Sequence, residues 1–74
     1  MNNPISPQVK TALHKIRALA DAIKEVKEIP SGTLYAACME KISLNEYNRI
    51  IGLLVRSGLI ENKNNLLKWK LIQL

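Results

Sequence analysis

Residues 43–61 read SLNEYNRIIGLLVRSGLIE, and this stretch decides the fold. Ser43 and Glu46 have the spacing of a capping box, in which each side chain accepts a hydrogen bond from the other residue's backbone N–H. Gly58 is typical of the left-handed residue that follows the end of a helix. A helix is therefore predicted over 44–57. Its buried face should consist of the apolar residues at helical intervals, Tyr47, Ile50, Ile51, Leu54 and Val55.

A β-hairpin is predicted after this helix. Residues 59–62 and 66–72 form two runs that suit strands, and the polar residues between them suit a turn. In the second run apolar and basic residues alternate, as in an antiparallel strand with one buried face. The residues expected to point inward are Leu67, Trp69 and Leu71, and those expected to point outward are Lys68 and Lys70.

A long helix is predicted on the N-terminal side, over residues 6–27. Ser6 suits the N-cap and Pro7 the first helical position, and the helix must end before Pro30 because proline disfavours a helical residue before it. Residues 1–5 are expected to be disordered. The predicted core row of this helix is Val9, Leu13, Ile16, Ala20 and Ile23.

A second apolar row lies beside this core row and consists of Ala12, Ile16, Leu19, Ile23 and Val26. Because the rows share two residues, the helix has either one wide apolar arc around the core or two apolar faces. In the second case a partner packs on the helix, and a homodimer through this helix is one such arrangement. The interface would then consist of Ala12, Leu19 and Val26, together with Leu53 from the later helix.

A short strand and a further helix are predicted between these two helices. Ile29 suits an edge strand, Pro30 ends that strand because it has no N–H to donate, and Ser31 suits an N-cap. The further helix is therefore placed at 32–41. Its expected inward residues are Leu34, Tyr35, Cys38, Met39 and Ile42.

Length and composition indicate one globular domain over residues 1–74. A chain of 74 residues, of which 47% are hydrophobic and 23% are charged, can form one small core and has no length for a second domain. Its longest charge-free apolar run is far shorter than the roughly 20 residues of a membrane span. Its first residues do not resemble a secretory signal, so we expect a soluble cytoplasmic protein.

The reactive side chains favour binding over catalysis. One cysteine and one histidine allow neither an internal disulfide nor a tetrahedral zinc site, so no cofactor or metal is expected. His14 falls on the polar side of its helix and Cys38 on the buried side of another, which does not suit a nucleophile and its base. We expect no enzyme activity and no small-molecule substrate. The net charge of +5 favours a polyanionic partner.

The predicted order of elements is helix, short strand, helix, turn, helix and hairpin. In this order residues 32–72 resemble the winged helix-turn-helix family, and residues 50–61 are similar to the family's passage from the recognition helix through a glycine into the first wing strand. Ile42 and Ser43 fall at the turn between the two helices, and Ala37 falls at the small-residue position where they meet. The resemblance implies a mainly helical α+β fold with three helices and a hairpin wing, and it implies DNA binding.

The helix over 44–57 corresponds to the recognition helix of this family. A rotation of 100° per residue places one polar stripe opposite Tyr47, with Asn48 at its flank. Arginine binds guanine or phosphate, asparagine pairs with adenine, and glycine allows close approach to a groove. The alternative is a solvated helix face that serves solubility. The stripe consists of Asn45, Arg49, Gly52 and Arg56.

Lysines on the predicted wing would add phosphate contacts beside the groove. Lys63 lies at the tip, and Lys68 and Lys70 share one face of the second strand. The alternative is that these lysines prevent the strand edge from pairing with other chains.

Two functions are weighed on these grounds. The first is a small DNA-binding protein or transcription regulator, acting as a dimer and binding mainly through wing and backbone contacts, with RNA left open as another partner. The second is a protein-interaction module on the same scaffold, for which Leu53 on the polar face is the best evidence.

Overall fold

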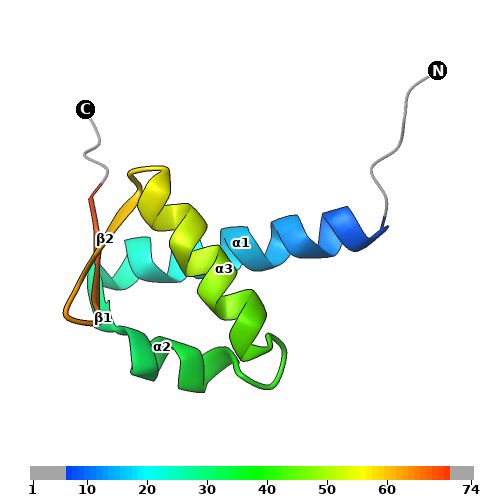
Figure 1. Ribbon diagram of the computed structural model, residues 1–74, viewed down its shortest axis with the longest axis horizontal. Helices are drawn as coiled ribbons and strands as arrows, with labels where there is room; N and C mark the ends of the chain where they lie inside the picture. The colour runs from blue at the N-terminus through cyan, green and yellow to red at the C-terminus, as the bar shows by residue number, and fades with distance from the viewer. Residues whose placement is uncertain (1–6, 71–74) are drawn as a thin grey trace.

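Three helices and a three-stranded sheet make up residues 7–70, the part of the chain that the computed structural model describes (Figure 1). In chain order the elements are α1 (Pro7–Val26), β1 (Glu28–Pro30), α2 (Ser31–Cys38), α3 (Leu44–Arg56), β2 (Ile60–Lys63) and β3 (Leu66–Trp69). The architecture is mainly helical α+β with a C-terminal antiparallel hairpin, a winged-helix topology, so the predicted fold class is confirmed. The predictions for residues 1–5, Ser6, Leu71 and Ile72 lie outside the described residues.

The sheet is built around β3, which lies between β1 and β2 and is antiparallel to both. Ile29 pairs with Leu67, so the predicted edge strand is confirmed. On the other side, Ile60 pairs with Trp69 and Asn62 pairs with Leu67. Because Ile60 and Leu67 are buried, their face of the sheet packs against the helices, and the alternate residues form the outer face.

Both predicted ends of α3 are confirmed by hydrogen bonds. The N–H of Glu46 donates to Ser43 Oγ (3.1 Å), and the N–H of Ser43 donates to Glu46 Oε1 (3.3 Å), which completes the capping box. At the other end Gly58 has a φ of 85°. Its N–H donates to the carbonyl of Val55, and the N–H of Leu59 donates to the carbonyl of Leu54, which is the Schellman pattern.

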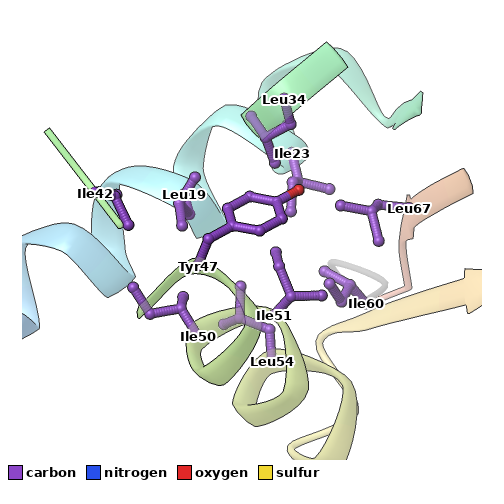
Figure 2. Packing of buried hydrophobic residues seen from close by; sticks show 10 residues of the cluster. All are labelled: Leu19, Ile23, Leu34, Ile42, Tyr47, Ile50, Ile51, Leu54, Ile60 and Leu67. Carbon is purple, nitrogen blue, oxygen red and sulfur yellow. The ribbon is translucent and has the colours of Figure 1, made fainter. Parts of the chain in front are cut away.

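Apolar side chains from all three helices and from the hairpin meet in one core (Figure 2). The predicted buried face of α3 is confirmed for four of its five residues, but Val55 is 38% exposed. Val55 lies at the edge of the apolar arc of α3. The buried core residues are Leu19, Ile23, Leu34, Ile42, Tyr47, Ile50, Ile51, Leu54, Ile60 and Leu67.

The core row predicted for α1 is wrong in its first half. Val9 is 48% exposed and Leu13 is 49% exposed, because the first turns of α1 extend beyond α2 and α3 (Figure 1). The core is instead filled by Leu19, which is 3% exposed and lies beside Ile42 and Tyr47 (Figure 2). The prediction that Leu19 belongs to an exposed partner interface is therefore wrong. Of the other residues named for that interface on α1, Ala12 and Val26 are exposed.

The second helix is shorter than predicted, since α2 ends at Cys38. The chain turns after Cys38, and the N–H of Ile42 donates to the Cys38 carbonyl (3.0 Å), which brings Ile42 into the core. Met39 was predicted to face inward but is largely exposed at this turn. Ser31 does not cap α2: Pro30 occupies the N-cap, and the Ser31 hydroxyl is bonded to Tyr47.

Candidate nucleic-acid interface

The exposed side of α3 forms a ridge with a groove on each side. Asn45, Arg49 and Arg56 are exposed, as predicted for the polar stripe, whereas Gly52 is half-buried. The hairpin-side groove separates this ridge from the hairpin tip and the start of α2, and its lining residues are Ser31, Tyr47, Asn48, Ile51, Gly52, Val55, Arg56, Asn62 and Asn65. The α1-side groove lies on the other side and is lined by Ala12, Lys15, Ile16, Glu46, Arg49, Ile50 and Leu53.

The hairpin-side groove brings Asn48, Gly52 and Arg56 together with amide groups that the sequence interpretation missed. Asn62 shares the inner strand face with Ile60, so the two-residue period of the strand could have placed it toward α3. Asn65 reaches the groove because of the turn conformation, for which the sequence carries a weaker signal. The structure thus places three predicted residues, Asn48, Gly52 and Arg56, in one groove with two asparagines of the wing.

The hairpin tip is held in a fixed position. Asn64 and Asn65 have φ values of 53° and 66°, as in the two-residue type I′ turns that suit the twist of a hairpin. The N–H of Asn65 donates to Asn62 Oδ1 (3.0 Å), and the Asn65 carbonyl accepts from the N–H of Ser31 (2.7 Å). The tip is therefore bonded to the first residue of α2, which preorganises one wall of the hairpin-side groove.

Tyr47 joins this wall to α3. Its phenol donates to the carbonyl of Ser31 (2.9 Å), and the Ser31 hydroxyl lies 2.8 Å from the same phenolic oxygen. Burial raises the pKa of the Tyr47 phenol, while the hydrogen bond with Ser31 acts in the opposite direction. The phenol is therefore neutral at physiological pH, and its ring packs against Tyr35 at a centroid distance of 5.0 Å.

Arg56 lies over Gly52. A Cβ atom added at Gly52 would lie 3.4 Å from Nη1 of Arg56, and outside its two chain neighbours and the adjacent backbone of its own helix it would meet no other described atom within 4 Å. The glycine thus leaves the Arg56 guanidinium close to the helix surface, at the edge of the hairpin-side groove. Asn48 lines the same groove, so a planar cationic donor and an amide are available from one helix.

Arg49 lies on the other side of the ridge, in the α1-side groove, and is therefore separated from Arg56. In this groove Lys15 Nζ donates to Glu46 Oε2 (3.0 Å). The hydrogen bond from Lys15 and the one from the Ser43 backbone lower the pKa of the Glu46 carboxyl. The predicted stripe is therefore one ridge that serves two different grooves.

The predicted wing lysines are not in either groove. Lys68 pairs with Glu28 on β1 and with Glu61 on β2, so it lies between two carboxylates on the outer face of the sheet. Its Nζ is 4.0 Å from Glu28 Oε1. Lys63 alternates with the inward Asn62 and also lies on the outer face, and Lys70 is exposed after β3. The wing presents asparagine to the hairpin-side groove where lysine was expected.

His14 and Cys38 line a third groove, between α1 and α2. Burial raises the pKa of the Cys38 thiol, which keeps the thiol protonated. Among residues 7–70 no three His, Cys, Asp or Glu side chains gather as metal ligands. Over the same range, every helix is too short or too polar to cross a bilayer.

Comparisons with protein-family models, with curated proteins and with solved structures found no match to this chain. The geometry of the grooves is therefore the evidence for the function of this chain.

Proposed function

We propose that this chain is a small DNA-binding protein of the winged helix-turn-helix family, which contacts DNA through the ridge of α3 and the hairpin-side groove. The order of α2, turn, α3 and hairpin supports the proposal, because in helix-turn-helix proteins the second of the two helices enters the major groove. Transcription regulation in the cytoplasm belongs to the same proposal.

The main support for the proposal is a glycine, Gly52, in the interior of α3. A glycine inside a helix costs about 0.5–1 kcal/mol of stability relative to alanine. The fold does not require it, since Gly52 has helical backbone and an added Cβ would meet only Arg56 Nη1, at 3.4 Å, among described atoms outside its two chain neighbours and the adjacent helix backbone. A glycine at a position where the fold has room for a side chain fits close approach of a ligand to the α3 backbone.

The groups around Gly52 suit base edges better than phosphates. Arg56 can donate two parallel hydrogen bonds to guanine, and Asn48 can both donate to and accept from adenine. Asn62 uses its oxygen for the Asn65 N–H, so it offers a ligand its NH₂ donor. Arg56 is the one cation among the residues that line the hairpin-side groove. Phosphate contacts are therefore expected to be few.

Binding should depend on salt accordingly. If Arg49 and Arg56, the cations of the ridge, neutralise about two phosphates, log affinity should fall against log salt with a slope of about −1.8. Fluorescence anisotropy with random-sequence and AT-rich duplexes at two salt concentrations measures this slope. No salt-sensitive binding at micromolar protein would overturn the proposal.

Substitutions locate the site within the same assay. Arg56→Ala or Asn48→Ala should weaken binding about tenfold, because each good base contact contributes about 1–3 kcal/mol. Lys68→Ala is the matched control, since Lys68 lies between Glu28 and Glu61 on the outer face and should bind DNA as the unaltered protein does. A larger loss in Lys68→Ala than in Arg56→Ala would move the site to the outer face of the wing.

Gly52→Ala tests directly whether Gly52 contributes to DNA binding. The substitution should raise the free energy of unfolding by about 0.5–1 kcal/mol, because alanine suits a helix interior better than glycine. It should also weaken DNA binding, because the methyl group occupies the space beside Arg56. Urea denaturation and anisotropy on the same preparation measure both effects. A variant that is more stable and binds equally well would show that Gly52 has no part in binding.

Duplex RNA distinguishes binding in the major groove from binding to the phosphate backbone alone. The deep, narrow major groove of duplex RNA excludes a helix such as α3, so duplex RNA should bind more weakly than duplex DNA of the same sequence. Equal affinity for both duplexes would indicate binding to the phosphate backbone alone.

A further inference from the structure

An apolar strip along the N-terminal half of α1 is not used by the proposed DNA site. The first turns of α1, blue in Figure 1, extend beyond α2 and α3. Leu13 is 49% exposed on these turns, and Leu53 on α3 is 41% exposed at the α1-side groove. Ala12, Ile16 and Leu53 line the α1-side groove, and at 100° per residue Val9 and Leu13 lie on the same side of α1 as Ile16. We name these five residues the α1–α3 strip.

The extended part of α1 keeps much of its apolar surface exposed. Residues 8–14 are all classed as exposed, and among them Val9 is 48% and Leu13 is 49% exposed. Helices in proteins are stabilised mainly by packing of an apolar face, so cover on these two residues would stabilise the turns. Burying Leu13 and Leu53 against a ligand would remove apolar surface from water, which favours binding. The strip therefore has the properties of a docking surface.

Basic side chains border the strip. At 100° per residue along α1, Lys10 and Arg17 lie on one side of the strip and Lys15 lies on the other. Arg49 lines the α1-side groove from α3. From its first residue to Ala20, α1 contains no Asp or Glu. The border of the strip is therefore positive on both helices.

The neighbouring carboxylates neutralise this border in part. Glu46 is bonded to Lys15, so that pair carries no net charge. Arg17 lies 3.8 Å from Asp21, but both side chains are largely exposed, and such i,i+4 pairs are weak and screened by salt. Within residues 7–70, Lys10 and Arg49 form no ion pair. A ligand that matches the strip therefore combines apolar side chains with carboxylates.

An acidic helix fits the strip better than a second copy of this chain does. In a two-fold antiparallel pair of α1 helices, the same side of each helix lies next to its equivalent. The side that carries Lys10 and Arg17 would then meet the Lys10 and Arg17 side of the second copy, and the like charges would repel. An amphipathic helix, in contrast, can lay anchors at i, i+3, i+4 and i+7 into a groove between two helices. We propose that the α1–α3 strip docks an acidic amphipathic helix of a partner protein, with the apolar anchors of that helix against Leu13 and Leu53.

A peptide titration tests this proposal without nucleic acid. The probe is a synthetic helical peptide with leucine at the anchor positions and glutamate elsewhere, and the matched probe has lysine in place of each glutamate. Two-dimensional NMR should show amide shifts at Ala12, Leu13, Arg49 and Leu53 with the acidic probe, while Asn62 should not move. The lysine probe should bind at least about tenfold more weakly, because it meets a border of like charge.

Surface variants separate docking from folding. Leu13→Glu and Leu53→Glu replace exposed side chains, so both should fold normally and each should lower affinity for the acidic peptide about tenfold or more. Val26→Glu is the control, because Val26 is also 50% exposed but lies at the far end of α1; it should bind as the unaltered protein does. Circular dichroism checks the fold of each variant.

Two results would overturn the proposal. One is equal binding of the acidic and lysine peptides, which would remove charge complementarity. The other is a dimer of the unaltered protein in light scattering that Leu13→Glu converts to a monomer, which would assign the strip to a second copy. Neither result depends on Arg56 or Asn48, so failure here leaves the DNA proposal standing.

Discussion

At the scale of single residues, Lys27 determines where α1 ends. Its φ is 75°, a left-handed conformation that costs a residue with a Cβ about 1–2 kcal/mol. The conformation turns the chain from α1 into β1, and the Lys27 carbonyl accepts the N–H of Trp69 (2.8 Å), which ties this corner to the sheet. Lysine occupies a position that glycine would occupy without strain.

Lys27→Gly should therefore stabilise the protein. We expect the free energy of unfolding to rise by about 1 kcal/mol, because glycine adopts the left-handed conformation at no steric cost. Lys27→Ala is the control, since it removes the same charge and retains the strain. Urea denaturation of the two variants measures the difference, and equal stability would show that the backbone at this position is unstrained.

At the scale of elements, the start of α3 couples a helix cap to α1. Glu46 accepts from the Ser43 backbone as part of the capping box and from Lys15 of α1. These contacts lower the pKa of the Glu46 carboxyl in the folded state below its ordinary value of 4.5. A carboxyl with a lowered folded pKa stabilises the fold above the pKa of the unfolded chain, and this contribution is lost as the pH falls through the folded pKa.

Glu46→Gln should reveal this contribution as a function of pH. Glutamine can also complete a capping box, so the substitution removes mainly the charge that faces Lys15. We expect the variant to be less stable than the unaltered protein at neutral pH, and the difference should shrink as the pH falls through the folded pKa of Glu46, because the protonated carboxyl is neutral like glutamine. Urea denaturation at neutral pH and at a series of acidic pH values measures the difference. A difference that grows in acid would contradict the lowered pKa.

Elements with local stop and start signals were predictable from the sequence. The capping box at Ser43, the glycine at 58 and the proline at 30 place α3, the hairpin and β1 correctly, because each signal acts within a few residues. The end of α2 was not predictable in this way, since Glu40 and Lys41 suit a helix. The chain leaves the helix there because Ile42 reaches the core.

The core side of α1 shows a different limit. Two apolar rows share Ile16 and Ile23, so periodicity alone cannot tell which row packs inward. Contacts with α2 and α3 decide in favour of Leu19 and leave Leu13 exposed. The candidate site was also predictable only in part. The stripe on α3 follows from helix geometry, whereas strand register places Asn62 and the turn places Asn65.

At the scale of the whole molecule, the choice between the two rows of α1 can be measured. Leu19→Ala should lower the free energy of unfolding by about 2–5 kcal/mol, because it opens a cavity in the core. Leu13→Ala should change it by about 0.5 kcal/mol or less, because Leu13 lies at the surface. Thermal and urea denaturation of this matched pair test the packing of α1. Equal losses would mean that the N-terminal half of α1 is buried in solution.

The position of Trp69, the single tryptophan of the chain, has a practical consequence for all these measurements. Its half-buried ring lies on β3, beneath Lys24 Nζ at 6.0 Å from the ring centroid, and it lines neither groove beside α3. Intrinsic indole emission should therefore follow the loss of the sheet and remain unchanged when a ligand fills either groove. The protein thus contains an optical reporter of its own folding, which distinguishes a folded variant that cannot bind from an unfolded variant.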